Sequence, residues 1–454
     1  MMTWRQQRRV FLVLVLLVSL MGVVVFFTQQ HWTTDELVSR SLQSGERCGV
    51  KVGSHPFTPV HGSKTSLLNA FLEHRAAKAS VRLLAIVWRE EDNKRSRCIF
   101  CCHNDGRLVT VAAERNTHPS HYFFPYCTGD FLCQIPDGCR PRYAGLLSEG
   151  MEQNDITVLP VLNQAERRSS FPLNFTVCLS TMFNHYDNVL QFIQAMELYR
   201  LLGAQRVIVY KSSCSPAMEE VLRYYSNQVG LVEVLSWPID THFKVSSSWL
   251  PSLSPGDLHY YGQIPANNDC VYRYMYQTRY LFMHDADEVI LPTGSDSWAE
   301  LLSTLESKHG ENVNFYFANN IFPIEEKEKD SRFDVAEWAG LPGVNFLLHV
   351  LKEPGDSGYT TGKLVVNPRS VLQMEVHAIQ LHNPGGGTVK IGPELGQLYH
   401  MRRRKDTALK RSDLVRDEGL LRFAPRLVEQ VNVALSNMKL PSKDLLISEL
   451  EDGN

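Results

Sequence analysis

A short acidic cluster at the end of an apolar segment has the residue types of a cation site. Residues 284–288 read His-Asp-Ala-Asp-Glu and follow the apolar run 280–283. A strand that ends in Asp-x-Asp sets two carboxylates at the rim of a sheet. Oxygen ligands of this kind suit a hard dication such as Mn²⁺ or Mg²⁺, which can in turn hold a diphosphate. Asp285 and Asp287 are therefore predicted metal ligands, although an acidic pair alone is also typical of a solvated turn.

The elements expected to position this cluster alternate between strand and helix from residue 171 onward. The expected order is strand 175–180, a helix from Asp187 to Gly203, strand 206–210, helix 217–227, strand 231–235, helix 267–279 and strand 280–283. Such alternation predicts parallel strands with right-handed crossovers. Asp187 is the expected N-cap of the first helix, and Asn268 and Asp269 are expected at the start of the last one.

Ligands of parallel sheets bind outside the carboxyl ends of the strands. Three expected loops lie at those ends, and they carry Asn184, then Lys211 with Ser213, and then the acidic cluster. We therefore expect Asn184, Lys211, Ser213 and Asp285 to contact a bound nucleotide-sugar. The convergence of three loops supports the metal–diphosphate interpretation of the acidic cluster.

Four residues further along the chain are candidates to complete this site. His377 or His400 is expected to add a metal ligand from a later loop, although a lone histidine is more often a packing or surface residue. Lys363 and Arg402 are expected to meet the diphosphate or an anionic acceptor. For the basic run 402–405, a solvated face is an equally good interpretation.

Transfer of a sugar to a hydroxyl calls for a general base, and a carboxylate on a loop after the acidic strand would fit. Glu325 and Glu326 are the predicted catalytic residues, and the same region offers Asp334, Glu337 and Glu375. Surface charge is the plainer interpretation of each. Three aromatic residues are candidates to stack on sugar rings, with core packing as the alternative: Trp298, Trp338 and Tyr316.

The N-terminal segment has the pattern of a membrane anchor. Residues 10–27 are apolar apart from Ser19 and Gly22, and at about 1.5 Å per residue they span roughly 27 Å, enough for a thin bilayer. Three arginines precede the segment and acidic residues follow it, which predicts a cytosolic N-terminus. A cleaved signal peptide is the alternative, but the apolar stretch is longer than usual and no small-residue cleavage site follows. A short span favours Golgi membranes over the thicker plasma membrane.

All 10 cysteines lie beyond the predicted anchor, and seven of them precede residue 140. An even number in an oxidising compartment predicts disulfides, whose pairing the sequence does not give. A zinc knuckle at residues 98–103 is the alternative, although no second Cys-x-x-Cys pair follows at zinc-ribbon spacing. Asn174 begins an Asn-x-Thr sequon beside an apolar strand and is a candidate glycan site.

The composition describes an ordinary globular chain. Its 454 residues are 44% hydrophobic and 21% charged, with a formal net charge of −3. This length predicts two to three domains, and the charge gives no indication of nucleic-acid binding.

The chain resembles glycosyltransferase family 92 over about residues 80–410. The resemblance rests on five stretches in this order: 201–210, 268–273, 282–288, 363–377 and 398–402. It implies an inverting GT-A type galactosyltransferase that uses UDP-galactose and Mn²⁺. It further implies likeness to β-1,4-galactosyltransferases that extend galactose or fucose on N-glycans. The chain departs from the family at Lys211-Ser212, where Asp-Asn is common, and at Met401, where Tyr is common.

The predicted fold is α/β: a GT-A type nucleotide-sugar-binding sheet with flanking helices, preceded by a cysteine-rich, mostly β region and an N-terminal transmembrane helix. The predicted parts are a cytosolic tail (1–9), an anchor (10–27), a stem (28–65), a β region (66–170), a catalytic domain (171–425) and a C-terminal tail (426–454). The predicted protein is a Golgi type II membrane glycosyltransferase. The alternatives are a carbohydrate-binding ectodomain without turnover, a transferase using another UDP-sugar, and a metal-dependent phosphotransferase or hydrolase.

Overall fold

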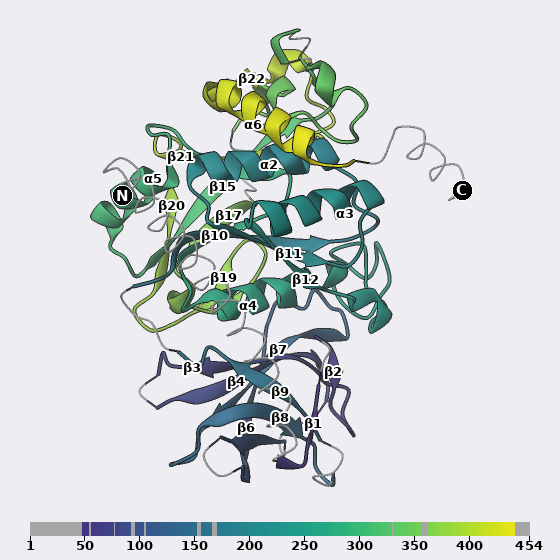
Figure 1. Ribbon diagram of the computed structural model, residues 1–454, viewed down its shortest axis with the longest axis vertical. Coiled ribbons are helices and arrows are strands. Elements are labelled where there is room, and N and C mark those ends of the chain that lie inside the picture. Colours follow the sequence, from purple (N-terminus) through teal and green to yellow (C-terminus); the bar gives the residue numbers. More distant parts are fainter. Residues whose placement is uncertain are drawn as a thin grey trace, which may run out of the picture.

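The structure is a computed structural model that describes residues 48–440, apart from 54–55, 77, 92–95, 104–105, 152–155, 166–169, 329–330, 334 and 356–360. A β domain and a mixed α/β domain lie one above the other along the long axis of the molecule (Figure 1). Within these residues no helix has the length and apolar character needed to cross a membrane. The predicted anchor at 10–27 and the end of the chain from residue 441 lie outside the described residues, as does Asp334.

The β domain is a nine-stranded sheet in the order β1-β9-β8-β5-β6-β7-β4-β3-β2, and a further pairing of β3 with β9 closes most of it into a ring. Its strands are β1 (Lys51–Val52), β2 (Thr58–Pro59), β3 (Ser66–Glu73), β4 (Ser80–Trp88), β5 (Arg97–Cys102), β6 (Leu108–Thr117), β7 (Tyr126–Gln134), β8 (Pro141–Leu147) and β9 (Thr157–Leu162). Closure removes the unpaired edges that an open sheet would present. β1 and β2 extend this domain into the segment expected to be a stem.

Disulfides cross-link the β domain, as its cysteine content predicts. The three pairs are Cys48–Cys101, Cys98–Cys133 and Cys102–Cys139. The candidate zinc-knuckle cysteines therefore belong to three different disulfides. A fourth bond joins Cys178 to Cys270 in the second domain.

The second domain is built on a sheet in the order β12-β11-β10-β13-β17-β15-β21-β14, with β20 also paired to β15. Its first four strands are parallel, as predicted: β12 (Val232–Ser236), β11 (Arg206–Lys211), β10 (Leu173–Met182) and β13 (Thr278–His284). The remaining strands are β17 (Gly362–Val366), β15 (Val313–Pro323), β21 (Gly396–Arg402), β14 (Glu288–Pro292) and β20 (Gly387–Ile391). β17 runs antiparallel to both of its neighbours. The small pairs β16 (Leu351–Lys352) with β22 (Val415–Arg416) and β18 (Val371–Met374) with β19 (Ile379–His382) complete the domain.

Helices cover both faces of this sheet. α2 (Val189–Leu202) and α3 (Pro216–Arg223) lie on one face, α4 (Gln263–Tyr274) lies between the sheet and the β domain, and α6 (Ala424–Asn437) packs on α2 (Figure 1). α5 (Trp298–His309) follows β14. α6 begins two residues before the region expected to be a tail and occupies its first part.

Two expectations for helix starts were wrong. Asn188, not Asp187, precedes α2, and the Asp187 carboxylate instead accepts a hydrogen bond from Ser215. α4 begins at Gln263 after Gly262, whose φ of 69° is left-handed, so Asn268 and Asp269 lie inside the helix and are fully buried. The reason is that Pro265 falls in the first turn of α4, where the missing N–H costs no helical hydrogen bond.

The two domains share a core. One hydrophobic cluster contains Phe71 and Leu84 of the β domain together with Val271 and Tyr272 of α4 and Met283 of β13. Burial of such side chains stabilises by about 25 cal/mol per Å². The β domain is therefore packed directly against the helix that supports the acidic cluster.

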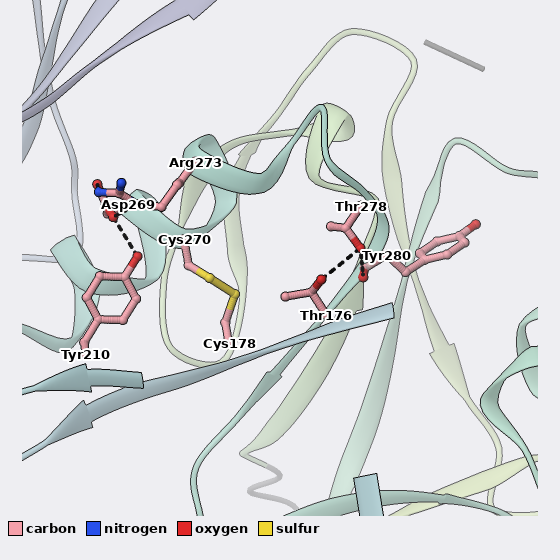
Figure 2. Close-up of a disulfide and its surroundings, with 8 residues drawn as sticks. All are labelled: Thr176, Cys178, Tyr210, Asp269, Cys270, Arg273, Thr278 and Tyr280. Carbon is pink, nitrogen blue, oxygen red and sulfur yellow. Dashed lines mark hydrogen bonds and ion pairs between the residues drawn. A yellow bond between two sulfur atoms is a disulfide. The ribbon is translucent and has the colours of Figure 1, made fainter. Parts of the chain in front are cut away.

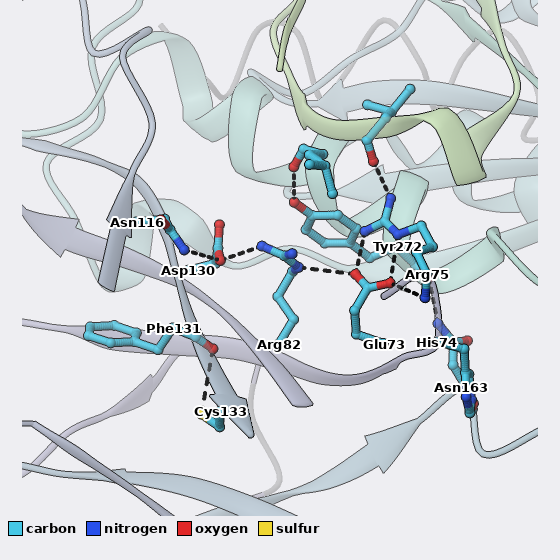
Figure 3. A network of polar contacts seen from close by, with 12 residues as sticks. Glu73, His74, Arg75, Arg82, Asn116, Asp130, Phe131, Cys133, Asn163 and Tyr272 are labelled. Carbon is cyan, nitrogen blue, oxygen red and sulfur yellow. Dashed lines mark hydrogen bonds and ion pairs between the residues drawn. The ribbon is translucent and has the colours of Figure 1, made fainter. Parts of the chain in front are cut away.

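A buried polar network lies at the same junction (Figure 3). Arg82 pairs with both Glu73 and Asp130, and its guanidinium lies 5.4 Å from the centre of the Tyr272 ring. Arg75 binds the Glu73 carboxylate and also donates to the carbonyl of Val371 in the second domain. Each charge is thus paired, as burial requires.

The Glu73 carboxylate makes the stability of the fold depend on acid pH. Burial alone raises its pKa, but the hydrogen bond and charge of Arg75 and the charge of Arg82 outweigh it and lower the pKa to about 2 from 4.5. Because the folded pKa is the lower one, this stabilisation is present above the unfolded value and is lost as the pH falls towards 2. At neutral pH, we expect the free energy of unfolding of the native chain to exceed that of E73Q by about 2–3 kcal/mol. This difference should shrink steadily as the pH falls. Urea unfolding across this pH range measures it, and a difference independent of pH would contradict the assignment.

Candidate functional site

The acidic cluster forms a tight turn between β13 and β14, at the carboxyl edge of the parallel strands. The Asp285 N–H donates to the Glu288 carboxylate at 2.8 Å, and the Glu288 N–H donates to the Asp285 carbonyl at 3.1 Å. The Asp285 and Asp287 side chains remain 30% and 33% exposed. Both carboxylates are therefore accessible to a ligand at this edge.

Asp285 is held by donors from three elements. Lys363 Nζ of β17 lies 2.7 Å from Oδ2, and Gln263 Nε2 of α4 lies 3.1 Å from Oδ1. The Ser180 hydroxyl of β10 also donates to Oδ1. Burial pushes the pKa of Asp285 upward, but the Lys363 charge and the hydrogen bonds from Lys363 and Ser180 hold it well below its usual range. Asp285 is therefore an anion with a fixed orientation.

Lys363 is almost fully buried, with 3% of its side chain exposed, and its ammonium also lies 3.3 Å from Glu288. Burial lowers the pKa of Lys363, but the charges of Asp285 and Glu288 raise it above the ordinary value, so the ammonium stays charged. In Glu288 burial dominates and raises the pKa, while Lys363 and His400 oppose it. The lysine expected to meet a diphosphate is thus engaged with carboxylates of its own chain.

Asp287 and His400 form a second pair beside the first. His400 Nε2 lies 3.3 Å from Asp287 Oδ2, and its Nδ1 lies 3.2 Å from Glu288 Oε1. The antiparallel register of β14 and β21 brings this about by placing His400 opposite Glu288. Burial lowers the pKa of His400, but the charges of Asp287 and Glu288 outweigh it and raise the pKa.

His377 lies apart from this pair. Its Nδ1 is 2.8 Å from the Gly362 carbonyl, which can only accept, so Nδ1 carries the proton and Nε2 has the free lone pair in the neutral ring. Burial and then the charge of Lys363 lower the pKa of His377. In the described part of the chain, no three His, Cys, Asp or Glu side chains stand close enough to hold a metal ion together. The four predicted ligands therefore divide into Asp287 with His400, Asp285 with Lys363, and His377 with Gly362.

The loops expected to contact a nucleotide do converge. A β-bridge joins Tyr186 to Cys214, and the Ser213 hydroxyl accepts the N–H of His185 at 3.0 Å. Asn184 is exposed on this loop with a left-handed φ of 54°. Lys211, the last residue of β11, pairs with Glu219 of α3 at 2.5 Å. These residues line one side of the rim that carries the acidic cluster.

Arg402 and the predicted general bases lie at the end of β21 and β15. Arg402 is exposed, and its positive charge opposes the raised pKa values of Tyr260 and His400. Glu326 pairs with Arg404 and, at 2.7 Å, with Arg411. Glu325 accepts the N–H of Arg404 at 3.3 Å. Both oxygens of Glu326 are thus occupied by guanidinium groups, which does not favour a role as a base.

The other sequence candidates have structural partners. Glu375 is buried, accepts the N–H of His377 at 3.1 Å and is also hydrogen-bonded by Tyr122. Trp298 is fully buried and stacks on Phe282, and Trp338 is buried with its indole N–H bound to Asn432 at 2.8 Å. Core packing is therefore the correct interpretation of both tryptophans. Tyr316 is half-buried.

Several polar groups at this rim escaped the sequence reasoning. Ser180 and Gln263 both bind Asp285, although neither belongs to a recognisable motif. Buried side-chain atoms without a protein partner also occur on the elements of this edge: Thr181 Oγ1, Tyr186 Oη, Gln263 Oε1, His284 Nε2 and Asn319 Oδ1. Buried polar atoms are usually satisfied, so unpaired ones indicate a place for water or a polar ligand.

The disulfide between Cys178 and Cys270 fixes two of these donors (Figure 2). Cys178 lies on β10 two residues before Ser180, and Cys270 lies on α4 seven residues after Gln263, on the same helix face. Asp269 precedes Cys270 in α4. Its carboxylate accepts a hydrogen bond from the Tyr210 hydroxyl of β11 at 2.6 Å and one from Arg273 Nε at 2.9 Å. The bond therefore holds α4 on the sheet at the level of the acidic turn.

Removal of the Lys363 ammonium should destabilise the domain, because it leaves the Asp285 and Glu288 carboxylates buried together. For K363M we expect the free energy of unfolding, measured in urea, to fall by about 2–4 kcal/mol. This is slightly less than the loss for breaking a fully buried ion pair, because Asp285 is partly exposed. The double variant K363M/D285N should recover part of the loss. Lys390 is exposed on β20, so K390M is the matched control and should change stability by less than about 0.5 kcal/mol. Equal effects of the two lysine variants would refute the buried-cation role.

Loss of the disulfide at the site should loosen α4. We expect C178A/C270A to lose about 2–5 kcal/mol of stability and to show faster amide hydrogen exchange in Gln263–Tyr274. The control C102A/C139A removes a disulfide of the β domain and should accelerate exchange there while leaving α4 protected. Unchanged exchange of α4 in C178A/C270A would show that the bond does not hold the helix.

Known proteins are similar to this chain in sequence. The sequence model of glycosyltransferase family 92 matches residues 174–438, which include every residue of the acidic rim. A glycosyltransferase family 92 protein of Caenorhabditis elegans is 23% identical over 236 residues, covering 52% of this chain and 43% of that protein. The β-1,4-galactosyltransferase galt-1 of the same organism is 22% identical over 124 residues, covering 27% of this chain and 26% of its own length. The aligned regions thus span less than half the length of these relatives. Because the family match covers more than half of the sequence, the chain belongs to glycosyltransferase family 92.

Proposed function

We propose that this chain is a metal-dependent, inverting glycosyltransferase of the GT-A type that transfers galactose from UDP-galactose to a sugar hydroxyl of a glycoprotein N-glycan. Family membership supports glycosyl transfer from an activated sugar. The single observation that carries the metal-dependent form is the Asp287–His400 pair at the carboxyl edge of a parallel sheet, 3.3 Å apart, with a third of the Asp287 side chain exposed. Ligands of such sheets bind at this edge.

The residues of the rim fit a dication. Asp287 offers a carboxylate oxygen and His400 an imidazole nitrogen, a donor set that Mn²⁺ accepts. Two protein donors leave other coordination positions for diphosphate oxygens. The partnerless hydroxyl of Tyr186 is a further polar group near them, since the charge of Asp287 contributes to its raised pKa after burial itself. When bound there, a dication supplies charge neutralisation for a departing nucleoside diphosphate.

The surrounding residues orient and hold the site. Lys363, Gln263 and Ser180 keep Asp285 ionised and fixed, so that its free edge can accept a hydrogen bond from the donor substrate. A preorganised anion of this kind costs no reorganisation when substrate binds. Asn184 and Ser213, on converging loops at the same rim, are the proposed contacts to the nucleoside.

The donor and acceptor assignments rest on kinship. One relative bears the name β-1,4-galactosyltransferase, and it matches 27% of this chain. This supports galactose as the transferred sugar and a glycan hydroxyl as the acceptor. Glucose from UDP-glucose is the competing donor, and the assay below separates the two.

We also propose that the catalytic domain acts in the Golgi lumen, carried by an anchor at residues 10–27. Four disulfides support an oxidising compartment, because cytosolic thiols are kept reduced. The sequence from Val10 to Phe27 has the apolar character of a short transmembrane segment.

The proposal predicts that UDP binding depends on both the cation and Asp287. Calorimetric titration with UDP should give an affinity in Mn²⁺ that falls at least about tenfold when a chelator is added. D287N with Mn²⁺ present should show a similar loss, because Asp287 would hold the cation that neutralises the diphosphate. Among UDP-galactose, UDP-glucose and UDP-N-acetylglucosamine, galactose should be transferred fastest to an N-glycan, read by mass increment.

The matched control is D296N, because Asp296 is 71% exposed and pairs only with Arg422 at the far end of β14. It should bind UDP like the native chain. UDP binding that ignores both Mn²⁺ and D287N would end the metal-dependent proposal. Glycan binding without any donor turnover would instead favour a carbohydrate-binding domain.

A further inference from the structure

A group of aromatic rings borders the acidic rim around Trp249. The Trp249 ring neighbours those of Tyr260 and His377, with ring centres 5.4 Å and 6.0 Å away and planes inclined by only 19° and 26°. All three side chains are half-buried. This differs from the core tryptophans Trp237 and Trp298, which are at most 1% exposed.

The β domain contributes a ring to the same group. Tyr122, on the loop between β6 and β7, meets Trp249 edge-on at 5.2 Å and stacks on His259 at 4.6 Å. Its hydroxyl donates to Glu375, two residues before His377. The two domains thus build one surface here.

This surface adjoins the candidate site. His377, which neighbours Trp249, binds the Gly362 carbonyl at 2.8 Å, and the next residue, Lys363, binds Asp285 at 2.7 Å. Gln263, the donor to Asp285, follows Tyr260 by three residues. A molecule lying on Trp249 would therefore have its edge close to the acidic turn.

The backbone beneath these rings is strained. Tyr122, Tyr260 and Tyr261 have φ values of 48°, 27° and 50°, in the left-handed region that bulky residues avoid. Each such residue costs on the order of 1–3 kcal/mol, and strain of this kind persists mainly at functional sites. Core packing alone would not require three tyrosines to adopt it beside a half-exposed tryptophan.

We propose that Trp249, flanked by Tyr260 and supported by Tyr122, is the subsite that binds a pyranose ring of the acceptor glycan. The apolar C–H face of the sugar would stack on the indole, and the free Nε2 of His377 would accept a hydrogen bond from a ring hydroxyl. This inference rests on the proposed transferase function, since it assigns the acceptor side of the same site. It also gives the β domain a direct part in substrate binding.

The test compares W249A and W249F with the native chain in two separate assays. Saturation-transfer NMR with the methyl glycosides of galactose, fucose and N-acetylglucosamine reports sugar binding without turnover, and UDP titration in Mn²⁺ reports the donor side. W249A should weaken binding of the preferred glycoside at least about tenfold, while W249F retains most of it and both bind UDP like the native chain. The control W88A removes a half-buried tryptophan of β4 whose ring contacts are with Tyr126 and Lys64.

The outcomes separate the two proposals. Glycoside binding that survives W249A, or that is absent in the native chain for all three sugars, overturns the subsite. Failure of the native chain to bind UDP overturns the proposed transferase function while the glycoside result stands on its own.

The contribution of the β domain is tested by Tyr122. In a transfer assay Y122A should raise the acceptor KM at least about fivefold with kcat nearly unchanged, because the ring supports Trp249 without touching the reacting atoms. Y122F keeps the ring and should resemble the native chain. Equal losses of kcat in Y122A and Y122F would contradict a supporting role and indicate a role for the hydroxyl.

Discussion

The ammonium group of Lys363 lies between the carboxylates of Asp285 and Glu288, and the geometry of the rim depends on this contact. Three carboxylates follow one another within four residues, and packed at a sheet edge they would repel strongly without a cation. The lysine comes from β17, a strand that is inserted antiparallel beside the parallel set. It compensates Asp285 and Glu288, whereas Asp287 pairs with His400 and keeps about a third of its side chain exposed.

The position of this rim is transmitted from both domains. The Cys178–Cys270 bond holds α4 on the sheet, and the other side of α4 packs on strands of the β domain through Phe71 and Tyr272. The ion network of Glu73 and Arg82 satisfies the charges buried at the same junction. Because the α4 N-terminus supplies Gln263 to Asp285, displacement of the β domain would be felt at the acidic turn. The aromatic group around Trp249 extends this coupling, since Tyr122 crosses from one domain to the other.

Much of the catalytic domain was predictable from local pattern. The parallel strands β10, β11 and β12, the helices between them and the acidic turn after β13 all appear where apolar periodicity and turn residues indicated. The disulfide content of the β domain was predictable too, whereas its pairing and ring closure were not, because the partner strands are distant in sequence. The start of α4 was misplaced by four residues, because the helix begins before Pro265, and the first turn of a helix tolerates proline.

The sequence by itself determined which residue types stand at the rim, because strand ends and an Asp-x-Asp turn follow from local propensity and alternation. It singled out Asp285, Asp287, Lys363 and His400, but only the tertiary structure decided which of these side chains pair with one another. The register of β14 on β21 brings His400 beside Asp287. The insertion of β17 brings the Lys363 ammonium within hydrogen-bond distance of Asp285. Glu325 and Glu326 bind Arg404, and Trp298 is buried in the core whereas Trp249 stays half-exposed. These outcomes depend on contacts between residues far apart in the chain, and no local pattern encodes them.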